Sequence, residues 1–364
     1  MTTLGQGRSA RFRRGMVLIV TLWILGLLSI LLLSLIDRLR LEMALTDYRC
    51  AQGRADDLLD SGLARALWAV RQDRKAEVDS LRDPWASSRP MSEEGLIPPE
   101  YADQESPAVR WQVVDEGSKL NVNTVKREVL LSLLKTDYEG IVDGDALAEY
   151  VADWIDADGQ GAGEEDRYRT CVPPYAPRND KMPILEEMLL VDGVAPWLFY
   201  GEDRDGDGRF EPNEDDGDRS WPPDNADGQI QPGLRDLLTV WGEGGLNVNT
   251  APPSTLAAVF AAQMEPAAAA ELATKIIEAR RGPDGLEGTE DDTPLKSTQQ
   301  IAAITTTKVY QKCRQMGAPL AVGSTAFTIA AHVHLESEGV DAHGRGLAVR
   351  EKGGVRLAYW RVEQ

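Results

Sequence analysis

The sequence predicts an α+β protein with a long N-terminal helix, a small antiparallel sheet and a large, mostly helical region inserted into that sheet. Residues 16–36 form an uncharged apolar run, and the first proline of the chain is Pro84, so one helix can continue well beyond the run. Apolar and polar residues alternate near residue 110 and again close to the C-terminus, as they do in half-buried strands. Residues 118–322, between these two regions, have helical character.

The balance of charge limits what the protein can bind. Its 364 residues include 39 Lys and Arg and 59 Asp and Glu, which gives a formal net charge of −20. Affinity for nucleic acid comes from basic residues on phosphates, so we expect no nucleic-acid partner. The many carboxylates suit hard cations such as Ca²⁺. Three Cys are too few for a disulfide-built scaffold, although a Cys171–Cys313 bridge is conceivable, with Cys50 left unpaired.

The N-terminal helix has a membrane-length part and an outer part. Residues 1–15 contain four Arg and no acid. Residues 16–36 would form about 31 Å of helix, enough to cross a bilayer core, and the basic flank favours export of the chain beyond them. A cleaved secretory signal is the competing interpretation, but it would have a shorter apolar run and a small-residue cleavage site. Residues 37–82 are predicted as a stalk that packs through Leu59, Gly62, Leu63, Ala66, Leu67 and Val70.

The sheet is predicted from alternating segments at residues 108–115, 325–336, 346–351 and 354–362. Lys352-Gly353 is a turn signal between the last two segments. The sheet region therefore comprises residues 83–117 and 323–364.

The inserted region contains an internal repeat, in which Leu120-Asn121-Val122-Asn123-Thr124 matches Leu246-Asn247-Val248-Asn249-Thr250. We expect the Asn and Thr side chains to cap the helix after each copy, and Pro252 and Pro253 suit a first helical turn. The insertion then divides into two helical subdomains, 118–200 and 231–322, with an acidic loop at 201–230. Each copy continues with an apolar helix (126–134, 253–262), an amphipathic helix (145–156, 270–281) and a third segment (182–191, 294–304).

The N-terminus resembles a prepilin-type leader. Arg13-Arg14-Gly15 directly precedes Met16 and the apolar run, and such leaders are cut after the Gly on the cytoplasmic side, after which the new N-terminus is usually methylated. Most members of that superfamily have Glu at the fifth mature residue, where this chain has Val20. That departure, together with the order of helix, strand, insertion and meander, resembles the minor pseudopilin K family of the type II secretion system. A plain signal anchor is the alternative for this segment.

The resemblance implies a pseudopilin fold whose insertion consists of duplicated, SAM-like subdomains that contact other proteins. It implies cleavage at Gly15–Met16 by the prepilin peptidase, and a single-pass protein of the bacterial inner membrane with its C-terminal body in the periplasm. The partners would be other minor pseudopilins and the major pseudopilin, and the role would be at the pseudopilus tip, assisting export across the outer membrane. Where helices pack in a pilus, the usual Glu pairs with the amine of a neighbouring subunit, so a subunit with Val20 is tolerated at the tip.

Other functions compete with this one. A type IV pilus minor pilin would share the leader, and a membrane-anchored, calcium-dependent binding module would retain residues 1–15. The repeat also resembles helix-hairpin-helix modules of DNA receptors, but it lacks their Gly-rich hairpin and basic residues. The chain has no P-loop, G-x-S-x-G, H-E-x-x-H or C-x-x-C motif, so we expect no enzyme.

Residues 203–214 fit the calcium-loop pattern D-x-D-x-D-G-x₅-E. Residues 201–229 hold eleven acidic residues and three Arg, so a compact loop would repel itself without a cation. We therefore predict Ca²⁺ as a structural, ordering ion, with a solvated acidic loop as the alternative. Asp203, Asp205 and Asp207 would be monodentate ligands, Arg209 would supply its carbonyl, Glu211 could act through water, and Glu214 would be bidentate.

Two further segments are weaker calcium candidates. One resembles the part of the K family in which calcium is bound in the insertion, and offers Asp153, Asp156, Asp158, Glu164, Glu165 and Asp166. The other resembles the calcium loop of the major pseudopilin, and offers Asp284, Asp291 and Asp292. Solvated loops are the alternative for both. Finally, His332 and His334 lie on one face of a predicted strand, so a metal pair is geometrically possible, although such residues more often only cover a sheet.

Overall fold

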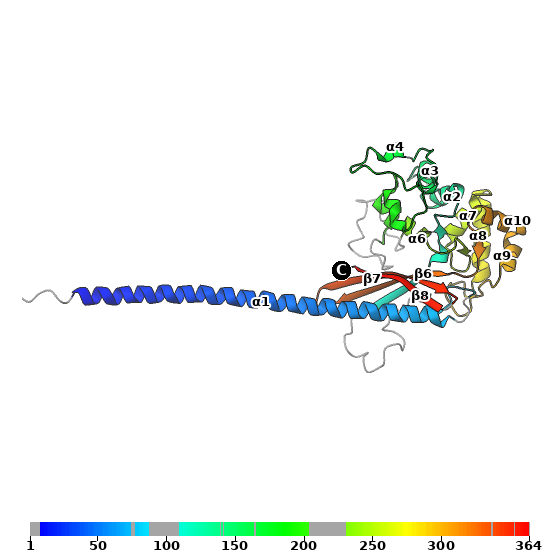
Figure 1. The fold of residues 1–364 in the computed structure, drawn as a ribbon. Helices are drawn as coiled ribbons and strands as arrows, with labels where there is room; N and C mark the ends of the chain where they lie inside the picture. The colour runs from blue at the N-terminus through cyan, green and yellow to red at the C-terminus, as the bar shows by residue number, and fades with distance from the viewer. Residues whose placement is uncertain are drawn as a thin grey trace, which may run out of the picture.

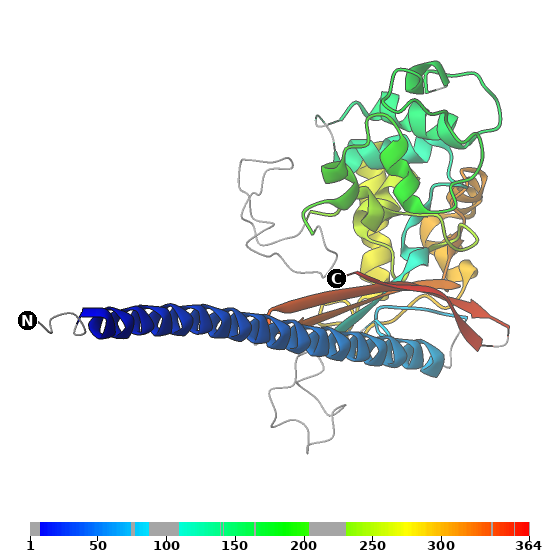
Figure 2. The same cartoon turned by 60° about the vertical axis from the view of Figure 1, so that its left-hand side comes forward.

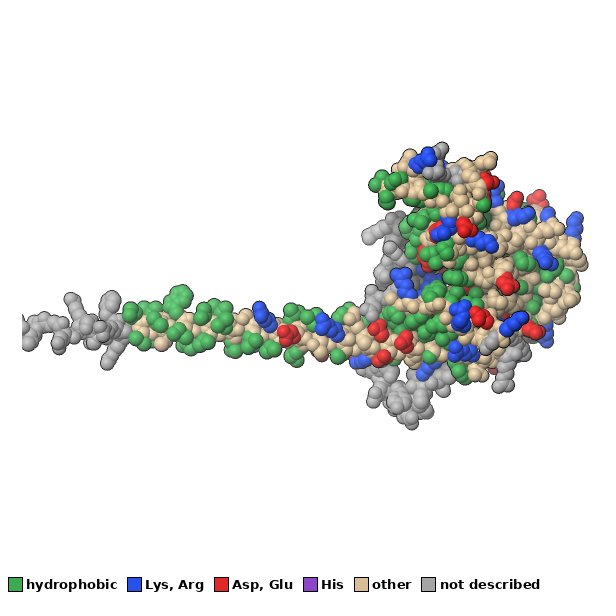
Figure 3. All heavy atoms as spheres, in the orientation of Figure 1, with side chains coloured by type: hydrophobic (Ala, Val, Ile, Leu, Met, Phe, Trp, Pro, Cys, Tyr) green, Lys and Arg blue, Asp and Glu red, His purple; other side chains and the backbone are tan. Residues whose placement is uncertain are grey.

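The computed structural model describes residues 8–73, 77–86, 109–138, 140, 142–163, 165–203, 231–335, 338–352 and 354–363. Its largest element is a single helix, α1 (Arg8–Gln72), which projects far beyond the folded body (Figure 1). The residues from Met16 to Cys50 are all exposed. Figure 3 shows the far part of this rod covered with apolar side chains, and charged side chains appear among them nearer the body. It is the one described helix long and apolar enough to cross a membrane.

The outer half of α1 packs on the sheet, as predicted. Its buried face begins at Ala51 and continues through Ala55, Leu59, Leu63, Ala66 and Val70, at helical spacing. Gly62 lies in this face, where a Cβ would come 3.0 Å from Val109 Cγ1. The small residues therefore let the helix approach the strands closely.

The sheet is antiparallel and has the order β1-β6-β7-β8. Because β1 pairs directly with β6, from Val109↔Val333 to Asp115↔Phe327, everything between them is an insertion. One face of the sheet forms a core with α1, and the helical body lies on the other side (Figure 2). The strands are β1 (Val109–Asp115), β6 (Ala326–Leu335), β7 (Val340–Glu351) and β8 (Gly354–Glu363).

Three of the predicted strands are confirmed, but the strand expected at 346–351 is longer than the sequence predicts, because β7 begins at Val340. The added part, 340–345, contains Gly344 and is followed by Gly346, and the missing side chains of these two residues interrupt the pattern of alternation. Trp360 on β8 fills that space, since a Cβ on Gly344 would come 2.2 Å from its ring.

The helical body shares one hydrophobic core between both copies of the repeat, with residues such as Leu133 and Val151 from the first and Val259 and Ile276 from the second. Helices α2 and α7, which come after the two motifs, pack against each other. The first copy contains α2 (Arg127–Asp137), α3 (Gly144–Ile155), α4 (Glu165–Tyr168), η3 (Leu185–Leu190) and α5 (Pro196–Tyr200). The second contains α6 (Leu234–Leu237), α7 (Pro253–Ala261), α8 (Pro266–Arg280), α9 (Thr298–Thr305) and α10 (Thr307–Gln315).

Each motif also forms a two-residue parallel strand pair. β2 (Leu120–Asn121) pairs with β3 (Leu238–Thr239), and β4 (Leu246–Asn247) pairs with β5 (Leu320–Ala321). A short 3₁₀ turn, η2 (Glu116–Ser118), connects β1 to the first motif. The two motifs therefore have the same local geometry, because the first two residues of each form a short parallel pair.

Candidate functional site

The two Asn residues of each motif act as clamps rather than as helix caps. Asn121 Oδ1 accepts from the N–H of Asn123 at 3.0 Å, and Asn247 Oδ1 accepts from that of Asn249 at 3.1 Å. The predicted caps were wrong, because α2 and α7 begin after Lys126 and Pro252 with no side-chain cap bond. The side-chain oxygens already accept a bond within the preceding turn, which is a frequent use of Asn.

The second Asn of each copy ties its third segment to the motif. The Asn123 amide bonds both backbone groups of Met182, at 2.8 and 2.9 Å. The Asn249 amide does the same at Leu295, also at 2.8 and 2.9 Å. This matching pair of clamps explains why both copies keep the motif, although the third segment of the first copy is the 3₁₀ turn η3 and that of the second is α9.

Asn247 also joins the helical body to the sheet and to the chain that leaves α1. Its Nδ2 donates to Asp115 Oδ2 at 2.9 Å and to the carbonyl of Asp79 at 3.1 Å. Thr250 Oγ1 donates to the same Asp115 oxygen at 2.6 Å, and the N–H of Gly117 donates to the other at 2.7 Å. Burial raises the pKa of Asp115, and hydrogen bonds from Ser324, Thr250 and Asn247 oppose that rise. We call these contacts of Asp115, Asp79, Asn247, Thr250 and Ser324 the polar joint.

A buried ion pair extends the polar joint. Lys119 Nζ lies 2.9 Å from Glu116 Oε1, and both side chains are almost fully buried. Thr328 on β6 donates to Glu116 at 2.8 Å. Although burial raises the pKa of Glu116, Lys119 and the hydroxyl donors hold it below its ordinary value. Glu116 is therefore a charged group that depends on partners from both the sheet and the helical body.

Three carboxylates gather where the chain leaves α1. Oxygens of Asp73, Asp79 and Asp83 come within 4.8 Å of one another, a grouping found among the described residues. Arg350 on β7 already lies on this group, 2.8 Å from Asp79 and 2.9 Å from Asp73. We interpret the group as an ion-pair network that fastens β7 to the end of α1.

Of the first predicted calcium loop, the structure describes only Asp203, whose carbonyl accepts a hydrogen bond from the buried side chain of Arg235. The other predicted ligands lie outside the described residues: Asp205, Asp207, Arg209, Glu211 and Glu214. This candidate remains a prediction from the sequence.

The second calcium candidate is a carboxylate cluster at the end of α3. Asp156 and Asp158 each accept a backbone N–H two residues onward, at 3.2 and 3.0 Å. Asp153, which the sequence also offered, has a buried side chain beside them and accepts the N–H of Gly163 at 2.7 Å. Burial above all, with the charges of neighbouring acids, raises the pKa of both Asp153 and Asp156. Glu165 and Asp166 begin α4, and their side chains lie outside the described residues.

Asn179 adds a neutral oxygen to this cluster. Its Nδ2 donates to the carbonyl of Asp158 at 3.2 Å, and its φ of 51° holds it in a left-handed turn. Among the described residues, its buried Oδ1 finds no hydrogen-bond donor. A buried amide oxygen without a donor is of the ligand type that Ca²⁺ accepts, and it lies on a residue whose Nδ2 bonds the backbone of Asp158. No sequence signal indicated Asn179, because it is separated from the acids by the intervening loop.

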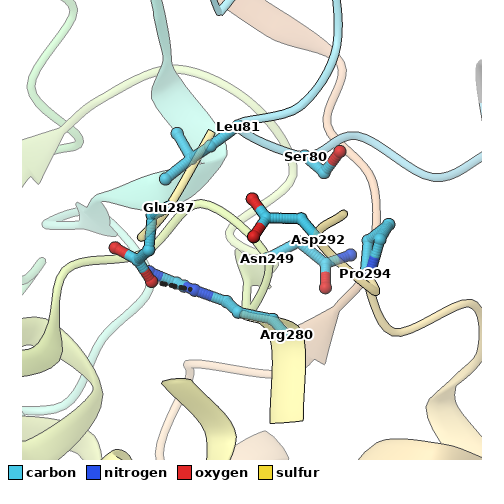
Figure 4. Close-up of a pocket in the computed structure, with 7 residues that line it drawn as sticks. All are labelled: Ser80, Leu81, Asn249, Arg280, Glu287, Asp292 and Pro294. Atoms are coloured by element: carbon cyan, nitrogen blue, oxygen red, sulfur yellow. Dashed lines mark hydrogen bonds and ion pairs between the residues drawn. The ribbon is translucent and has the colours of Figure 1, made fainter. Parts of the chain in front are cut away.

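The third candidate loop uses its acids to bind its own backbone. Asp291 accepts the N–H of Asp284 at 3.1 Å and the hydroxyl of Thr289 at 2.6 Å. Asp292 is buried and accepts the N–H groups of Gly282 and Gly288, at 3.0 and 2.7 Å. Figure 4 shows the small pocket beside it, where Arg280 and Glu287 form a pair at 2.7 Å. The carboxylates of this segment, like those of the second candidate, already accept hydrogen bonds from the protein, and this candidate also remains a prediction from the sequence.

The remaining predicted residues lie in α1 and in the helical body. Gly15 and Met16 are within α1, and Val20 is half exposed on its apolar rod. The three cysteines are free, so the conceivable Cys171–Cys313 bridge is absent. Cys313 is buried and accepts a bond from Gln263 at 3.2 Å.

The architecture is a long helix with an apolar, exposed half, packed on a small antiparallel sheet into which a helical body is inserted. Residues 112–200 match the family model of the type II secretion system (T2SS), protein K. The crystal structure of the GspK-GspI-GspJ complex from the enterotoxigenic Escherichia coli Type 2 Secretion System contains a chain of similar fold, with a TM-score of 0.55 and 16% identity over 87% of this chain and 99% of that one. No curated protein matches in sequence. The resemblance to protein K inferred from the sequence is therefore confirmed, as is the α+β fold.

Proposed function

We propose that this protein is a minor pseudopilin of the type II secretion pseudopilus, anchored in the inner membrane with its body in the periplasm, where it assists export across the outer membrane. The observation that carries the proposal is the exposed apolar half of α1 on a body of pseudopilin fold. An apolar helix of this length needs lipid or other apolar helices around it. The crystal structure similar to this chain is of a GspK-GspI-GspJ complex, which supports other minor pseudopilins as partners. The resemblance in sequence adds the major pseudopilin to the proposed partners.

The shape of the body supports a place at the tip. The helical body covers the side of the sheet opposite α1 and widens the protein well beyond the helix axis (Figure 2). A subunit inside a filament of packed helices needs neighbours on all sides, which such a body would obstruct. Val20 leaves no carboxylate for the amine of a neighbouring subunit, as a terminal position allows. The prepilin peptidase would release the mature chain at Met16, and the role is architectural rather than enzymatic.

We also propose that Ca²⁺ stabilises the helical body. Asp153, Asp156, Asp158 and Asn179 would hold one ion in the first copy, and the loop at 203–214 would hold another. When bound, Ca²⁺ supplies positive charge to oxygen clusters that otherwise repel themselves. The pKa values raised by burial and by neighbouring acids, together with the buried Oδ1 of Asn179, support the first of these sites.

Deleting the coding sequence is expected to abolish export of the proteins that the type II system secretes, and the full chain should restore it. A variant whose residues 16–36 are replaced by an unrelated membrane helix should be present in the membrane but should not restore export, because assembly needs the apolar surface of that helix. Secreted enzyme in the culture medium is the readout. Normal export without the protein, or loss of surface pili in its place, would favour the type IV pilus or binding-module alternative.

A further inference from the structure

All three histidines of the chain meet on one face of the sheet. His332 on β6 lies opposite His343 on β7, and His334 lies opposite Asp341. The four side chains are on the face away from α1, because Ala331, Val333 and Ala342 between them are buried in the core with that helix. The sequence places His332 and His334 on one face of a predicted strand. It does not reveal His343, because Gly344 and Gly346 interrupt the alternation that would mark this part of β7 as a strand.

The contacts within this group are close. The rings of His332 and His343 stack, with centroids 4.4 Å apart and planes 19° from parallel. Asp341 Oδ1 lies 2.5 Å from His334 Nδ1 and 3.6 Å from His332 Nε2. His332 is mostly buried, whereas His334 and Asp341 are about half exposed, at 51% and 54%. The group is therefore both built into the sheet and open to solvent.

The chemistry of these groups is that of a transition-metal site. Imidazole nitrogens suit zinc, copper and nickel, and three histidines can supply three ligands of a tetrahedral set whose fourth ligand is water. A carboxylate that hydrogen-bonds Nδ1 of a histidine fixes its orientation and strengthens its Nε2 as a ligand, which is what Asp341 does for His334. Hard cations such as Ca²⁺ prefer all-oxygen ligands, so this site differs in kind from the carboxylate clusters.

We propose that His332, His334 and His343, oriented by Asp341, form a zinc-binding site across β6 and β7. The stacked rings of His332 and His343 turn apart when the ion binds, so that one nitrogen of each faces it. The site lies near the turn of the β6–β7 hairpin. In that turn, Glu338 forms an ion pair with Arg54 of α1 at 3.1 Å. Bound zinc would thus hold the β6–β7 hairpin closed beside the start of the packed half of α1. The inference does not depend on the proposed function.

The test uses the full chain in detergent, with saturating Ca²⁺ so that oxygen sites are filled, and Co²⁺ as a spectroscopic probe for Zn²⁺. One Co²⁺ per chain should give the visible ligand-field bands of a tetrahedral nitrogen site, and equimolar Zn²⁺ should remove them. His332→Gln and His343→Gln should each abolish the bands, and Asp341→Asn should weaken Zn²⁺ binding about tenfold or more.

Asp57→Asn, a matched change at an exposed acid of α1, should leave the bands and the Zn²⁺ affinity unchanged. Metal-free melting curves of all variants should coincide with that of the wild type, which separates lost binding from lost folding. Absence of tetrahedral bands in the wild type would overturn the proposal. Bands that survive in His343→Gln would overturn it equally, because they would place the ion elsewhere.

Discussion

Replacing Asn247 with alanine is expected to lower the free energy of unfolding by about 3 kcal/mol, because it removes one of the donors to the buried carboxylate of Asp115 and leaves the buried carbonyl of Asp79 without that amide. Asn247 is fully buried, and its Nδ2 contacts both Asp115 and the carbonyl of Asp79. The substitution therefore removes at once a hydrogen bond from the helical body to the sheet and one to the chain that leaves α1. Denaturant unfolding of the full chain in detergent, monitored by tryptophan fluorescence, measures the effect.

The repeat provides its own control. Asn121 occupies the equivalent position of the first copy and makes the same turn, but its Nδ2 donates only to the neutral carbonyl of Trp241, at 3.1 Å. Asn121→Ala should cost about 1 kcal/mol, the ordinary value of a neutral hydrogen bond. Equal losses in the two variants would contradict the special role of Asn247 in the polar joint.

The loss of unfolding free energy in Asn247→Ala should also depend on pH. Burial raises the pKa of Asp115 in the folded protein above its unfolded value, so the folded state binds the proton more tightly. Protonation in acid therefore removes the cost of burying the charged carboxylate. Because Asn247→Ala removes a donor that stabilises the charged form, the pKa of Asp115 is raised further in the variant, and the variant gains more from protonation than the wild type does. The difference between the variant and the wild type should shrink as pH falls from 7 towards 5. A deficit that grows in acid would contradict this account.

Removing calcium with EGTA is expected to lower the melting temperature of the full chain by about 5 to 10 °C. An ion present at about one hundred times its dissociation constant contributes about 2.7 kcal/mol, which corresponds to a shift of this size in a body of this length. The physical cause is repulsion among Asp153, Asp156 and Asp158, because neighbouring acids help to raise the pKa values of the first two. Thermal melting with and without EGTA measures it.

Variants divide the calcium effect between its two proposed sites. Asn179→Ala should remove part of the EGTA-sensitive stability, because it deletes the amide oxygen beside Asp158. Glu214→Gln should remove another part, and Asp57→Asn should remove none. Identical melting curves with and without EGTA in the wild type would contradict calcium as a structural ion of this protein.

Much of the fold was predictable because its largest signals are local. The uncharged run at residues 16–36, the absence of proline before Pro84 and the alternation in three strands each depend on neighbours in sequence. The repeat was visible for the same reason, but its function was not. Whether Asn247 caps a helix or bonds Asp115 depends on where β1 lies, and β1 is distant in the chain.

The site residues were harder to predict, because a carboxylate in an acidic loop looks the same whether it binds a cation or its own backbone. Asp292 accepts three backbone N–H groups, which no spacing rule reveals. Asn179 matters through the burial of its amide oxygen, and His343 matters through the register of β7 with β6. These are properties of tertiary structure, and they add residues to the candidate sites that motif patterns alone do not contain.

The most direct test of the central claim, that this chain is processed and assembled as a pseudopilin, is the mass of its mature N-terminus. The protein should be isolated from the membrane of cells that contain the prepilin peptidase, and its N-terminal peptide sequenced by mass spectrometry. We predict a chain that begins at Met16 with a methylated amine and has Val20 as its fifth residue. A chain that retains residues 1–15, or one cut within or after the apolar run, would contradict the claim.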